Sequence, residues 1–491
     1  MNIYSWLKDH AAVRPEKVCI KTNEQEITYQ ELHKTVCAFG RALKKSGVTG
    51  GDKIVLVLPN IPEFIISYMA IIGLGATAVT VNPTYTPREV DHILWDSDAK
   101  VIILERSNLG NLSDIIKQNA LKHIITTGEG GDFNRWVSGQ SQEIGEDLSP
   151  DDPAVILYSA GLTGYPMGAM LTQRNLNHNS DLLRLCMDCD ETDMTLTVIP
   201  LFHSFSASVN MLSMLRLGGS IYLMKRLDFK ELNYALNEGG VTALCAVPTL
   251  FFGLIHHPDV QGVDCSGVRT LIAGGSALPL EIYRAFKEKF HQDIRQGYGI
   301  TEASPVCSVN RKHRPIKPDS IGQTVPEVEV RVVDEGGLSL KPNQIGELLF
   351  KGPNIMKGYY KHKKETADII RDGWLVTGDL GYVDEEGYIY ITGYKKEMII
   401  TSGFNVYSRE VEGVLNDIPG VKDSAITGVP DMMRGAIIKA YIALEDKTIS
   451  EQEIKQSARK RLAPYKTPRM VVFVNTIPRN EEGKVLWSHL P

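Results

Sequence analysis

The sequence predicts an α/β protein: a large N-terminal domain of βα sheets with a β-rich subdomain, followed by a small mobile C-terminal α+β domain. Two observations support this prediction. Short apolar strands alternate with helical patterns through most of the chain, a rhythm typical of sheets with helices packed on their faces. The chain also has 491 residues, which is more than one ordinary domain needs to bury its core.

The βα rhythm is clearest in the first part of the chain. In chain order, a strand, helix, strand, helix and strand are predicted at residues 53–59, 63–72, 76–81, 87–97 and 101–104. An uncharged run over 64–81 reaches the lower length limit of a membrane span, but Gly73 and Gly75 divide it. We therefore interpret this run as a helix, a turn and a buried strand.

A β-rich subdomain is predicted over residues 320–358, where strands at 328–333 and 347–351 lie among glycine and proline turns. Further on, a polar break at 393–396 separates two strand-like runs. We take this break as the border between two domains, residues 1–395 and 396–491. In the second domain, Ser408 is expected to N-cap one helix, and Ser450 with Glu453 to form the capping box of another.

The composition excludes several classes of function. Lys and Arg number 53 against 59 Asp and Glu, so the net charge of −6 gives no basic field that would attract nucleic acid. Seven cysteines do not form a disulfide framework, which favours a reducing, cytoplasmic compartment. Lys8 and Asp9 lie where a signal peptide would be apolar. Pro200 and His203 interrupt the uncharged run at 195–215, so no transmembrane segment is predicted.

A glycine-rich loop, YSAGLTGYPMG at residues 158–168, follows an apolar strand. Gly161 and Gly164 allow a tight turn, and Ser159 and Thr163 can direct hydroxyl groups at phosphate oxygens. The loop lacks the lysine of a Walker A motif. A turn of this kind is more often only a turn, so the loop alone is a weak signal.

Further motifs follow this loop in order: GYGITE at 297–302, TGD at 377–379, GYKKEMIITSG at 393–403 and PRNEEGK at 478–484. Together they resemble the adenylate-forming superfamily of acyl-CoA synthetases, nonribosomal peptide adenylation domains and luciferases, and most of all its fatty acyl-CoA ligases. The resemblance covers nearly the whole chain. It implies ATP- and Mg²⁺-dependent ligation of a carboxylic acid to coenzyme A, through acyl-AMP.

The resemblance also implies roles for single residues. Lys484 would bridge the attacking carboxylate and the α-phosphate, and Thr301 would hydrogen-bond near that phosphate. Glu302 would bind Mg²⁺, Asp379 would accept both ribose hydroxyls, and His203 would open or close the acyl site. These charges suit the attack of an anion on a polyanion, which needs neutralisation in the transition state.

Other residues would bind the nucleotide or move the domain. The phosphate loop would contribute Ser159, Gly161, Thr163 and Gly164. The adenine site would be walled by Gly274, Gly275, Ser276, Gln296, Gly297, Tyr298 and Gly299. Lys396 would be the hinge of the C-terminal domain, and Gly403 would enter the site for thioester formation. Lys466, with a basic run at 459–461, would meet CoA phosphates or belong to a solvated helix end.

Two departures from the family pattern leave alternatives open. Met167 replaces the usual loop lysine and Tyr394 replaces an arginine near ATP, which would weaken phosphate binding. The chain could therefore be a catalytically weakened sensor of nucleotide or acyl ligands, or could load a carrier protein in place of CoA. An aliphatic medium- or long-chain acid is the preferred substrate, an aromatic acid stays open, and so does a homodimer.

Overall fold

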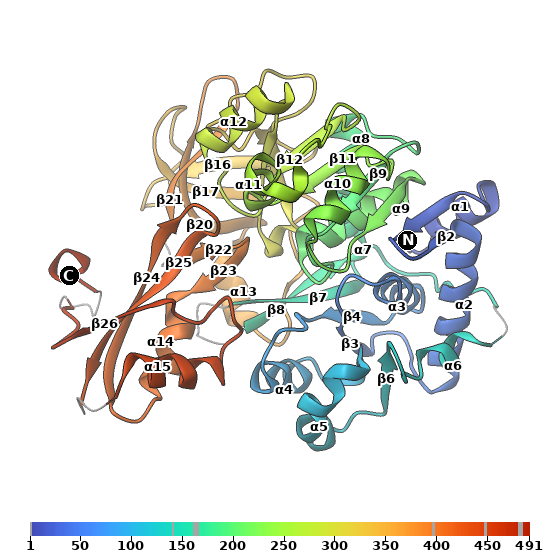
Figure 1. Ribbon diagram of the computed structural model, residues 1–491, viewed down its shortest axis with the longest axis horizontal. Coiled ribbons are helices and arrows are strands. Elements are labelled where there is room, and N and C mark those ends of the chain that lie inside the picture. The colour runs from blue at the N-terminus through green and yellow to red at the C-terminus, as the bar shows by residue number, and fades with distance from the viewer. Residues whose placement is uncertain (1, 140–141, 161–165, 395–397, 446–448, 480–484) are drawn as a thin grey trace.

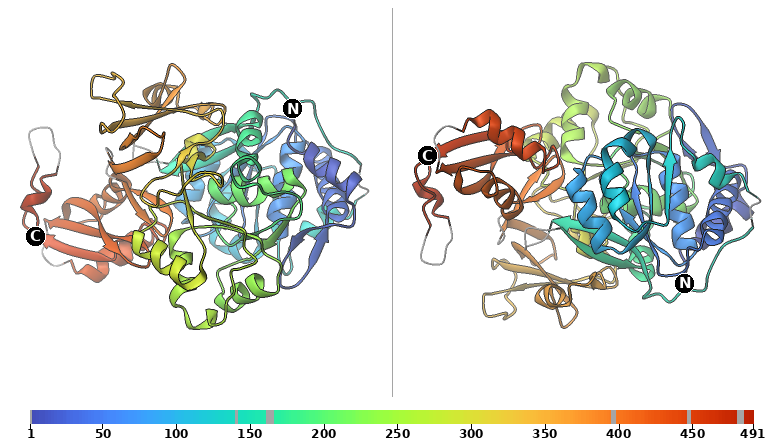
Figure 2. Two further views of the ribbon diagram at one scale, coloured as in Figure 1. Left: turned by 90° about the horizontal axis from the view of Figure 1, so that it is seen from above. Right: turned by 90° about the horizontal axis from the view of Figure 1, so that it is seen from below.

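The computed structural model describes residues 2–139, 142–160, 166–394, 398–445, 449–479 and 485–491 (Figure 1). A large N-terminal body contains three sheets, and a small C-terminal unit lies at one side of it, as both further views also show (Figure 2). This arrangement confirms the predicted fold class. The border predicted between residues 395 and 396 lies outside the described residues and stays a prediction.

The first sheet has the strand order β18-β8-β7-β4-β3-β5-β6. Its strands are β3 (Lys53–Val57), β4 (Thr77–Thr80), β5 (Ala99–Glu105), β6 (His123–Thr127), β7 (Pro153–Ala160), β8 (Pro166–Thr172) and β18 (Gly358–Tyr359). The helices around it are α1 (Ser5–Val13), α2 (Tyr29–Lys45), α3 (Pro62–Gly73), α4 (Pro87–Asp96), α5 (Leu109–Gln118) and α6 (Phe133–Val137). Strands β3 to β7 pair in parallel, which confirms the predicted βα rhythm.

Helix α3 explains why the uncharged run is not a membrane span. Every residue of this helix except Glu63 is buried, and Gly75, with φ +70°, makes the turn into β4. A helix that is apolar on all sides belongs in the core of a large protein or in a membrane. Among the described residues, no helix is long and apolar enough to cross a membrane.

The second sheet has the order β15-β14-β13-β12-β11-β9-β10-β1-β2. Its strands are β1 (Val18–Lys21), β2 (Glu26–Thr28), β9 (Met194–Thr197), β10 (Ser220–Leu223), β11 (Ala243–Ala246), β12 (Thr270–Ala273), β13 (Arg295–Gly299), β14 (Val306–Val309) and β15 (Gln323–Thr324). Its helices are α7 (Gln173–Ser180), α8 (Leu182–Met187), a π-helix (Ser206–Leu212), α9 (Ser213–Leu217), α10 (Phe229–Asn237), α11 (Pro248–His256) and α12 (Leu280–Phe290). Helices α10, α11 and α12 share one apolar cluster with β11 and β12.

The predicted β-rich subdomain is confirmed and extends to Tyr394. Its strands are β16 (Glu329–Val333), β17 (Gly346–Lys351), β19 (Ile370–Arg371), β20 (Trp374–Val383) and β21 (Ile389–Tyr394), with helix α13 (Lys363–Ile369) beside them. The C-terminal unit contains β22 (Met398–Thr401), β23 (Phe404–Tyr407), α14 (Ser408–Asn416), β24 (Val421–Asp431), β25 (Gly435–Leu444), α15 (Glu451–Arg459) and β26 (Met470–Val474). Its own apolar cluster joins α14 and α15 to the sheet β24-β25-β26.

One of the two predicted helix caps in this unit is confirmed. Ser450 and Glu453 form the capping box of α15. The prediction that Ser408 caps α14 is wrong, because Tyr407 is the N-cap residue and makes no side-chain cap bond. The hydroxyl of Ser408 instead donates to the carbonyl of Ile426 on β24, at 3.1 Å. The local pattern assigns the Ser408 hydroxyl to the helix cap, but the packing of α14 against β24 brings it to a strand carbonyl instead.

All seven cysteines are buried and none forms a disulfide. Burial raises the pKa of the Cys19 thiol to about 12 and that of Cys245 well above its ordinary value. Within the described residues, no group of three or more His, Cys, Asp or Glu side chains is arranged to hold a metal ion.

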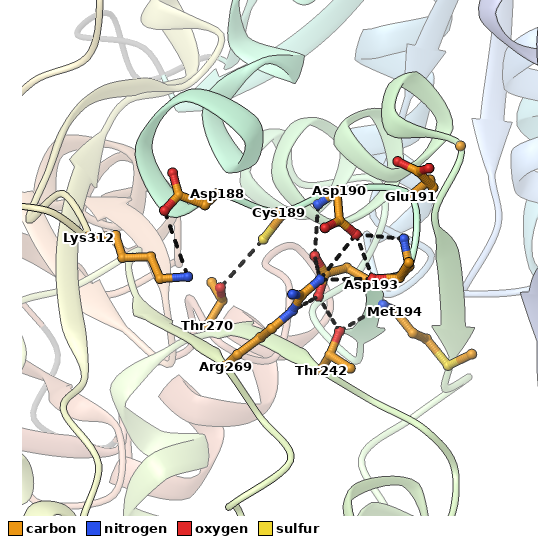
Figure 3. A network of polar contacts seen from close by, with 12 residues as sticks. Asp188, Cys189, Asp190, Glu191, Asp193, Met194, Thr242, Arg269, Thr270 and Lys312 are labelled. Atoms are coloured by element: carbon orange, nitrogen blue, oxygen red, sulfur yellow. Dashed lines mark hydrogen bonds and ion pairs between the residues drawn. The ribbon is translucent and has the colours of Figure 1, made fainter.

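An ion pair between the buried Asp193 and the partly exposed Arg269 ties together the amino ends of β9, β11 and β12 (Figure 3). Asp193 is fully buried and binds Arg269 through two contacts of 2.6 and 2.7 Å. The hydroxyl of Thr242 donates to the same carboxylate at 2.6 Å. Each of these residues directly precedes one of the three strands, so the cluster fixes the edge of the sheet opposite to the strands' carboxyl ends.

We expect Arg269→Ala to lower the free energy of unfolding by roughly 2 to 4 kcal/mol, because a buried carboxylate loses its cation. The matched control is Arg174→Ala, whose pair with Asp151 is solvent-exposed on both sides and should contribute less than about 1 kcal/mol. Urea unfolding of both variants measures the difference. Equal losses would contradict the role given to Asp193.

Candidate functional site

Most of the described candidate residues lie at the carboxyl ends of parallel strands. Ser159 is near the end of β7, Gly274 follows β12, and Thr301 follows β13. In open α/β sheets, this edge is where ligands bind. The cavities at this edge are lined both by the N-terminal body and by a loop of the C-terminal unit.

Glu302 joins the phosphate loop to the GYGITE motif. It lies in a single 3₁₀ turn, and its Oε1 accepts hydrogen bonds from Ser159 Oγ at 2.9 Å and from the hydroxyl of Tyr359 at 2.7 Å. Burial and the nearby Glu302 raise the pKa of Tyr359 well above its ordinary value, so the hydroxyl remains a donor. Two motifs separated by 143 residues in the chain therefore meet at one carboxylate.

A larger cavity of about 340 Å³ lies beside β13 and β20. The predicted adenine and ribose residues that line it are Gly275, Ser276, Gln296, Gly297, Tyr298, Gly299 and Asp379. The hydroxyl of Tyr298 donates to the Asp379 carboxylate. Burial, followed by the charge of Asp379, raises the pKa of Tyr298 well above its ordinary value. A flat aromatic face, backbone amides and a carboxylate together suit a nucleoside.

A second cavity, of about 60 Å³, has both apolar and polar walls. Its apolar walls are Leu182, Phe205, Ile272, Pro305, Val306 and Val309. Gly274, His203 and Thr301 also line this cavity and connect it to the polar part of the site. The arrangement can hold a small apolar group next to the residues that face a phosphate.

His203 is neutral in this site. Burial lowers its pKa to about 4, from an ordinary value of 6.5. Its Nδ1 accepts a hydrogen bond from the backbone amide of Phe205 at 3.2 Å, and the ring of Phe404 lies edge-on to it at 6.1 Å between centroids. His203 therefore contributes shape and hydrogen bonding, and no positive charge.

We expect the ¹⁵N resonances of the His203 ring to stay those of neutral imidazole down to about pH 5. An ordinary histidine takes up its proton near pH 6.5, as His203 does in the unfolded chain, so this residue should cost stability as the pH falls from 6.5 towards 4. A histidine-labelled sample titrated by NMR tests this, and His203→Gln identifies the resonances. A midpoint near 6.5 would contradict the burial argument.

A loop of the C-terminal unit is inserted into the site. Gly403 has φ +83° and lines the apolar cavity, and Asn405 of the same loop lines both this cavity and the larger one. A Cβ built on Gly275 would lie 3.9 Å from the Cα of Gly403, and one built on Gly403 would meet Val247 at 2.8 Å. Only glycine fits here. The structure therefore has Gly403 in the wall of the apolar cavity, and its role in thioester formation stays a prediction.

Three residues of the site were missed by sequence reasoning. Tyr359 lies on a two-residue strand with no motif of its own. Phe404 and Asn405 follow Gly403 directly, and this adjacency is the signal that could have found them. The ring of Phe404 stacks on Phe202, with centroids 6.4 Å apart. Asn405 lines the apolar cavity, the larger cavity and a third cavity beside Ser159.

Five predicted residues lie outside the described part of the chain: Gly161, Thr163, Gly164, Lys396 and Lys484. The last motif is described up to Arg479, and the chain is described again from Val485. Arg479 binds Asp423 at 3.0 Å, and Val485 packs against a small cluster around Tyr441. The C-terminus of the chain lies on the side of the C-terminal unit that faces away from the N-terminal body (Figure 1).

The structure contradicts both expectations for Lys466. Its side chain is 1% exposed, and its ammonium group binds Glu89 at 2.9 Å and Glu410 at 2.6 Å. It belongs neither to a solvated helix end nor to a patch open to CoA phosphates. Met167 is also buried, and β-sheet pairing sets it opposite Ser159, so its side chain is on the same face as the phosphate loop's hydroxyl.

Two family models match the chain. The AMP-binding enzyme model covers residues 7–360 and the AMP-binding enzyme C-terminal domain model covers residues 410–484. A long-chain-fatty-acid–CoA ligase of Bacillus subtilis is 32% identical over 99% of this chain and 94% of its own length. The 4-coumarate–CoA ligase 1 of Solanum tuberosum is 33% identical over 95% and 89%.

Solved structures agree with these matches. Apo MatB from Rhodopseudomonas palustris is 30% identical, with a TM-score of 0.76 over 100% of this chain and 98% of its own. A double mutant of o-succinylbenzoate CoA synthetase from Bacillus subtilis, bound to a product analogue, is 27% identical with a TM-score of 0.88 over 99% and 97%. Both similarities extend over the N-terminal body and the C-terminal unit together.

Proposed function

The chain belongs to the AMP-binding enzyme family, and we propose that it is an ATP- and Mg²⁺-dependent acid–CoA ligase that forms acyl-AMP and then acyl-CoA. The observation that carries this proposal is the meeting of a nucleoside-sized cavity and an apolar cavity along β13, where Gly297, Tyr298 and Gly299 line both. Named relatives are CoA ligases over nearly the full length of the chain.

In the first step, the acid carboxylate attacks the α-phosphorus of ATP, and pyrophosphate leaves with the bonding electrons. The cavity by Tyr298 and Asp379 would hold the nucleoside, which fixes the α-phosphate near Thr301. The apolar cavity would hold the acyl group. Holding both reactants in this way converts an encounter of two anions into an oriented reaction. Lys484 would supply a cation to the attacking carboxylate and the phosphate.

Glu302 is the residue that would hold Mg²⁺. A single carboxylate suits this ion, because Mg²⁺ in nucleotide sites usually binds one or two carboxylates together with substrate phosphates and water. The hydroxyls of Ser159 and Tyr359 fix the orientation of this carboxylate. The ion would neutralise charge on the phosphates.

In the second step, the CoA thiolate attacks the acyl carbon, the C–O bond to AMP breaks, and AMP leaves. In the described orientation of the C-terminal unit, Gly403 is inserted beside Gly275. This insertion supports our assignment of that orientation to the second step. Phe404 and His203 would cover the acyl-AMP, and their contact would exclude water from an intermediate that water can hydrolyse. The first step would need the other orientation, with Lys484 in the site.

For the acid, we propose an apolar aliphatic chain of medium length in preference to a long one. Several walls of the cavity are aliphatic or aromatic side chains, and its volume of about 60 Å³ is too small for a long chain without rearrangement. An aromatic acid is the second candidate. It is favoured by the compact shape of the cavity and by the 33% identical relative named for 4-coumarate.

The test is acid-dependent release of AMP and pyrophosphate over a panel of aliphatic and aromatic acids, with CoA, with a carrier protein or with neither. We expect thioester formation with CoA, and highest kcat/KM for a medium-chain acid. Thioester formed only on the carrier would show an acyl loader. Nucleotide binding without turnover of any acid would support the alternative of a catalytically weakened sensor. Met167 and Tyr394, which replace two cations of the family pattern, would explain that result.

A further inference from the structure

A buried cluster of charges connects the two domains at the edge of the site. It consists of Glu89 and Tyr85 from the N-terminal body and of Glu410, Tyr465 and Lys466 from the C-terminal unit. Lys466 Nζ lies 2.9 Å from Glu89 Oε1 and 2.6 Å from Glu410 Oε1. The same ammonium lies 4.9 Å from the centre of the Tyr85 ring.

Each ion of the cluster is nearly inaccessible to water. The side chains of Lys466, Glu89 and Glu410 are 1%, 7% and 6% exposed. Burial disfavours the charge of Lys466, but the phenols and carboxylates around it outweigh this and raise its pKa well above the ordinary value. Burial raises the pKa of Glu410, and Lys466 opposes this shift. Removing one partner of such a buried ion pair strongly destabilises the arrangement, because the other charge stays buried without a counter-charge.

A rotation of the C-terminal unit would affect the two ion pairs of Lys466 differently. Lys466 and Glu410 belong to the same unit and would move together. Glu89 is on α4, where its Oε2 also accepts from the amide and hydroxyl of Thr86 at 2.8 and 2.9 Å in a capping box. Glu89 is thus fixed to the N-terminal body. Rotation of the C-terminal unit would therefore break the Lys466–Glu89 pair and preserve the Lys466–Glu410 pair.

The cluster is continuous with the loop that enters the site. The ring of Tyr465, the residue before Lys466, stacks on Phe404 with centroids 4.4 Å apart. Phe404 in turn follows Gly403 and contacts His203 and Phe202. Lys466 and Tyr465 also line a polar cavity together with Ser159 and Thr301. The ion pair and the inserted loop are therefore parts of one interface.

We propose that Glu89 and Lys466 are positioning residues that hold the C-terminal unit in the thioester-forming orientation, and that their ion pair sets the balance between the two half-reactions. This rests on the proposed function, because the balance exists only in a two-step ligase. Neither residue touches a reacting atom. They act through Phe404 and Gly403, which line the site only in this orientation.

The sharpest variant is Glu89→Gln, which removes the charge between the domains and leaves Lys466 paired with Glu410. Thioester formation from supplied acyl-AMP and CoA should fall roughly tenfold or more, because the loss of one buried partner shifts the equilibrium by at least that factor. Acid-dependent pyrophosphate release in single turnover should be unchanged or faster. A merely structural defect would slow both half-reactions.

The matched control is Glu31→Gln. Glu31 is the same residue type at the same capping-box position, N3 of α2, and is bonded to Thr28 at 2.9 Å on an exposed surface. Its substitution should leave both half-reactions at the wild-type rate. Equal slowing of thioester formation in the two variants would overturn the proposal, and so would an unchanged rate in Glu89→Gln.

A second measurement does not depend on catalysis. Spin labels on Asp114→Cys and Met432→Cys would report the distance between the domains, since these side chains are largely exposed and every native cysteine is buried. We expect one dominant distance in the otherwise wild-type chain and a second population when Glu89→Gln is added. If the chain is not a ligase but the proposal on domain orientation is right, this shift still appears. An identical distribution in both proteins would overturn the proposal.

Discussion

Replacing Lys484 with alanine is expected to slow acyl-AMP formation by about a hundredfold or more, while thioester formation from supplied acyl-AMP stays close to wild type. The first half-reaction joins two anions and needs a cation at the reacting oxygens, and loss of one such charge-stabilising group typically costs 10²- to 10³-fold. The described neighbours Arg479 and Val485 pack within the C-terminal unit, against Asp423 and the cluster around Tyr441. Single-turnover assays of each half-reaction measure the split.

Lys422→Ala is the control for this experiment. Lys422 is an exposed lysine of the same unit, on β24, and its loss should change neither half-reaction. Equal losses in both half-reactions of Lys484→Ala would contradict its assignment to adenylation. Such a result would indicate a general defect of the C-terminal unit.

Glu302→Gln should lower the adenylation rate by about a hundredfold at low Mg²⁺ and raise the Mg²⁺ concentration needed for half-maximal rate. Glutamine keeps the size of the side chain and can still accept from Ser159 and Tyr359, so the fold around β13 should survive. Pyrophosphate release measured against Mg²⁺ concentration gives both quantities. Thermal unfolding without ligands should show little change.

The comparison variant for this prediction is Tyr359→Phe. It removes one hydroxyl donor at 2.7 Å from Glu302 but leaves the carboxylate and its charge. We expect a loss of roughly tenfold or less, because only the orientation of Glu302 is affected. A Mg²⁺ dependence that is the same in Glu302→Gln and in the wild type would exclude this carboxylate as the metal ligand.

Local patterns were enough to predict the secondary structure around the site. The strand predicted at 101–104 is the centre of β5, and the helix predicted at 63–72 is α3. Such patterns report which side chains one element buries, and this depends mainly on the element itself. The error at Ser408 has a different origin, because a hydroxyl near a helix start can bond either to the helix or to a neighbouring strand, and only packing decides.

The contacts between motifs could not be predicted in the same way. The motif pattern predicted that Ser159 and Glu302 share a nucleotide site, and the structure joins them directly. It gave no sign of Tyr359, whose position depends on a short strand added to the edge of β8. The burial of Lys466 depends on how two domains meet, and a sequence pattern treats it as any surface lysine. Contacts between residues far apart in the sequence depend on the packing of the whole fold, and local sequence patterns do not predict them.

The burial of every cysteine would protect an enzyme of the proposed kind from reaction with its own acyl intermediate. An acyl adenylate is an electrophile that a cysteine thiolate attacks readily, whereas the protonated thiol is a poor nucleophile. Cys307 lies on β14, next to the strand that bears the nucleotide cavity, yet it is inaccessible and burial raises the pKa of its thiol well above the ordinary value. All seven thiols are enclosed by the fold, and the thiol of Cys307 stays protonated. Self-acylation of these thiols by the proposed intermediate would thereby be avoided, and the acyl group would be left for an acceptor that enters from solution.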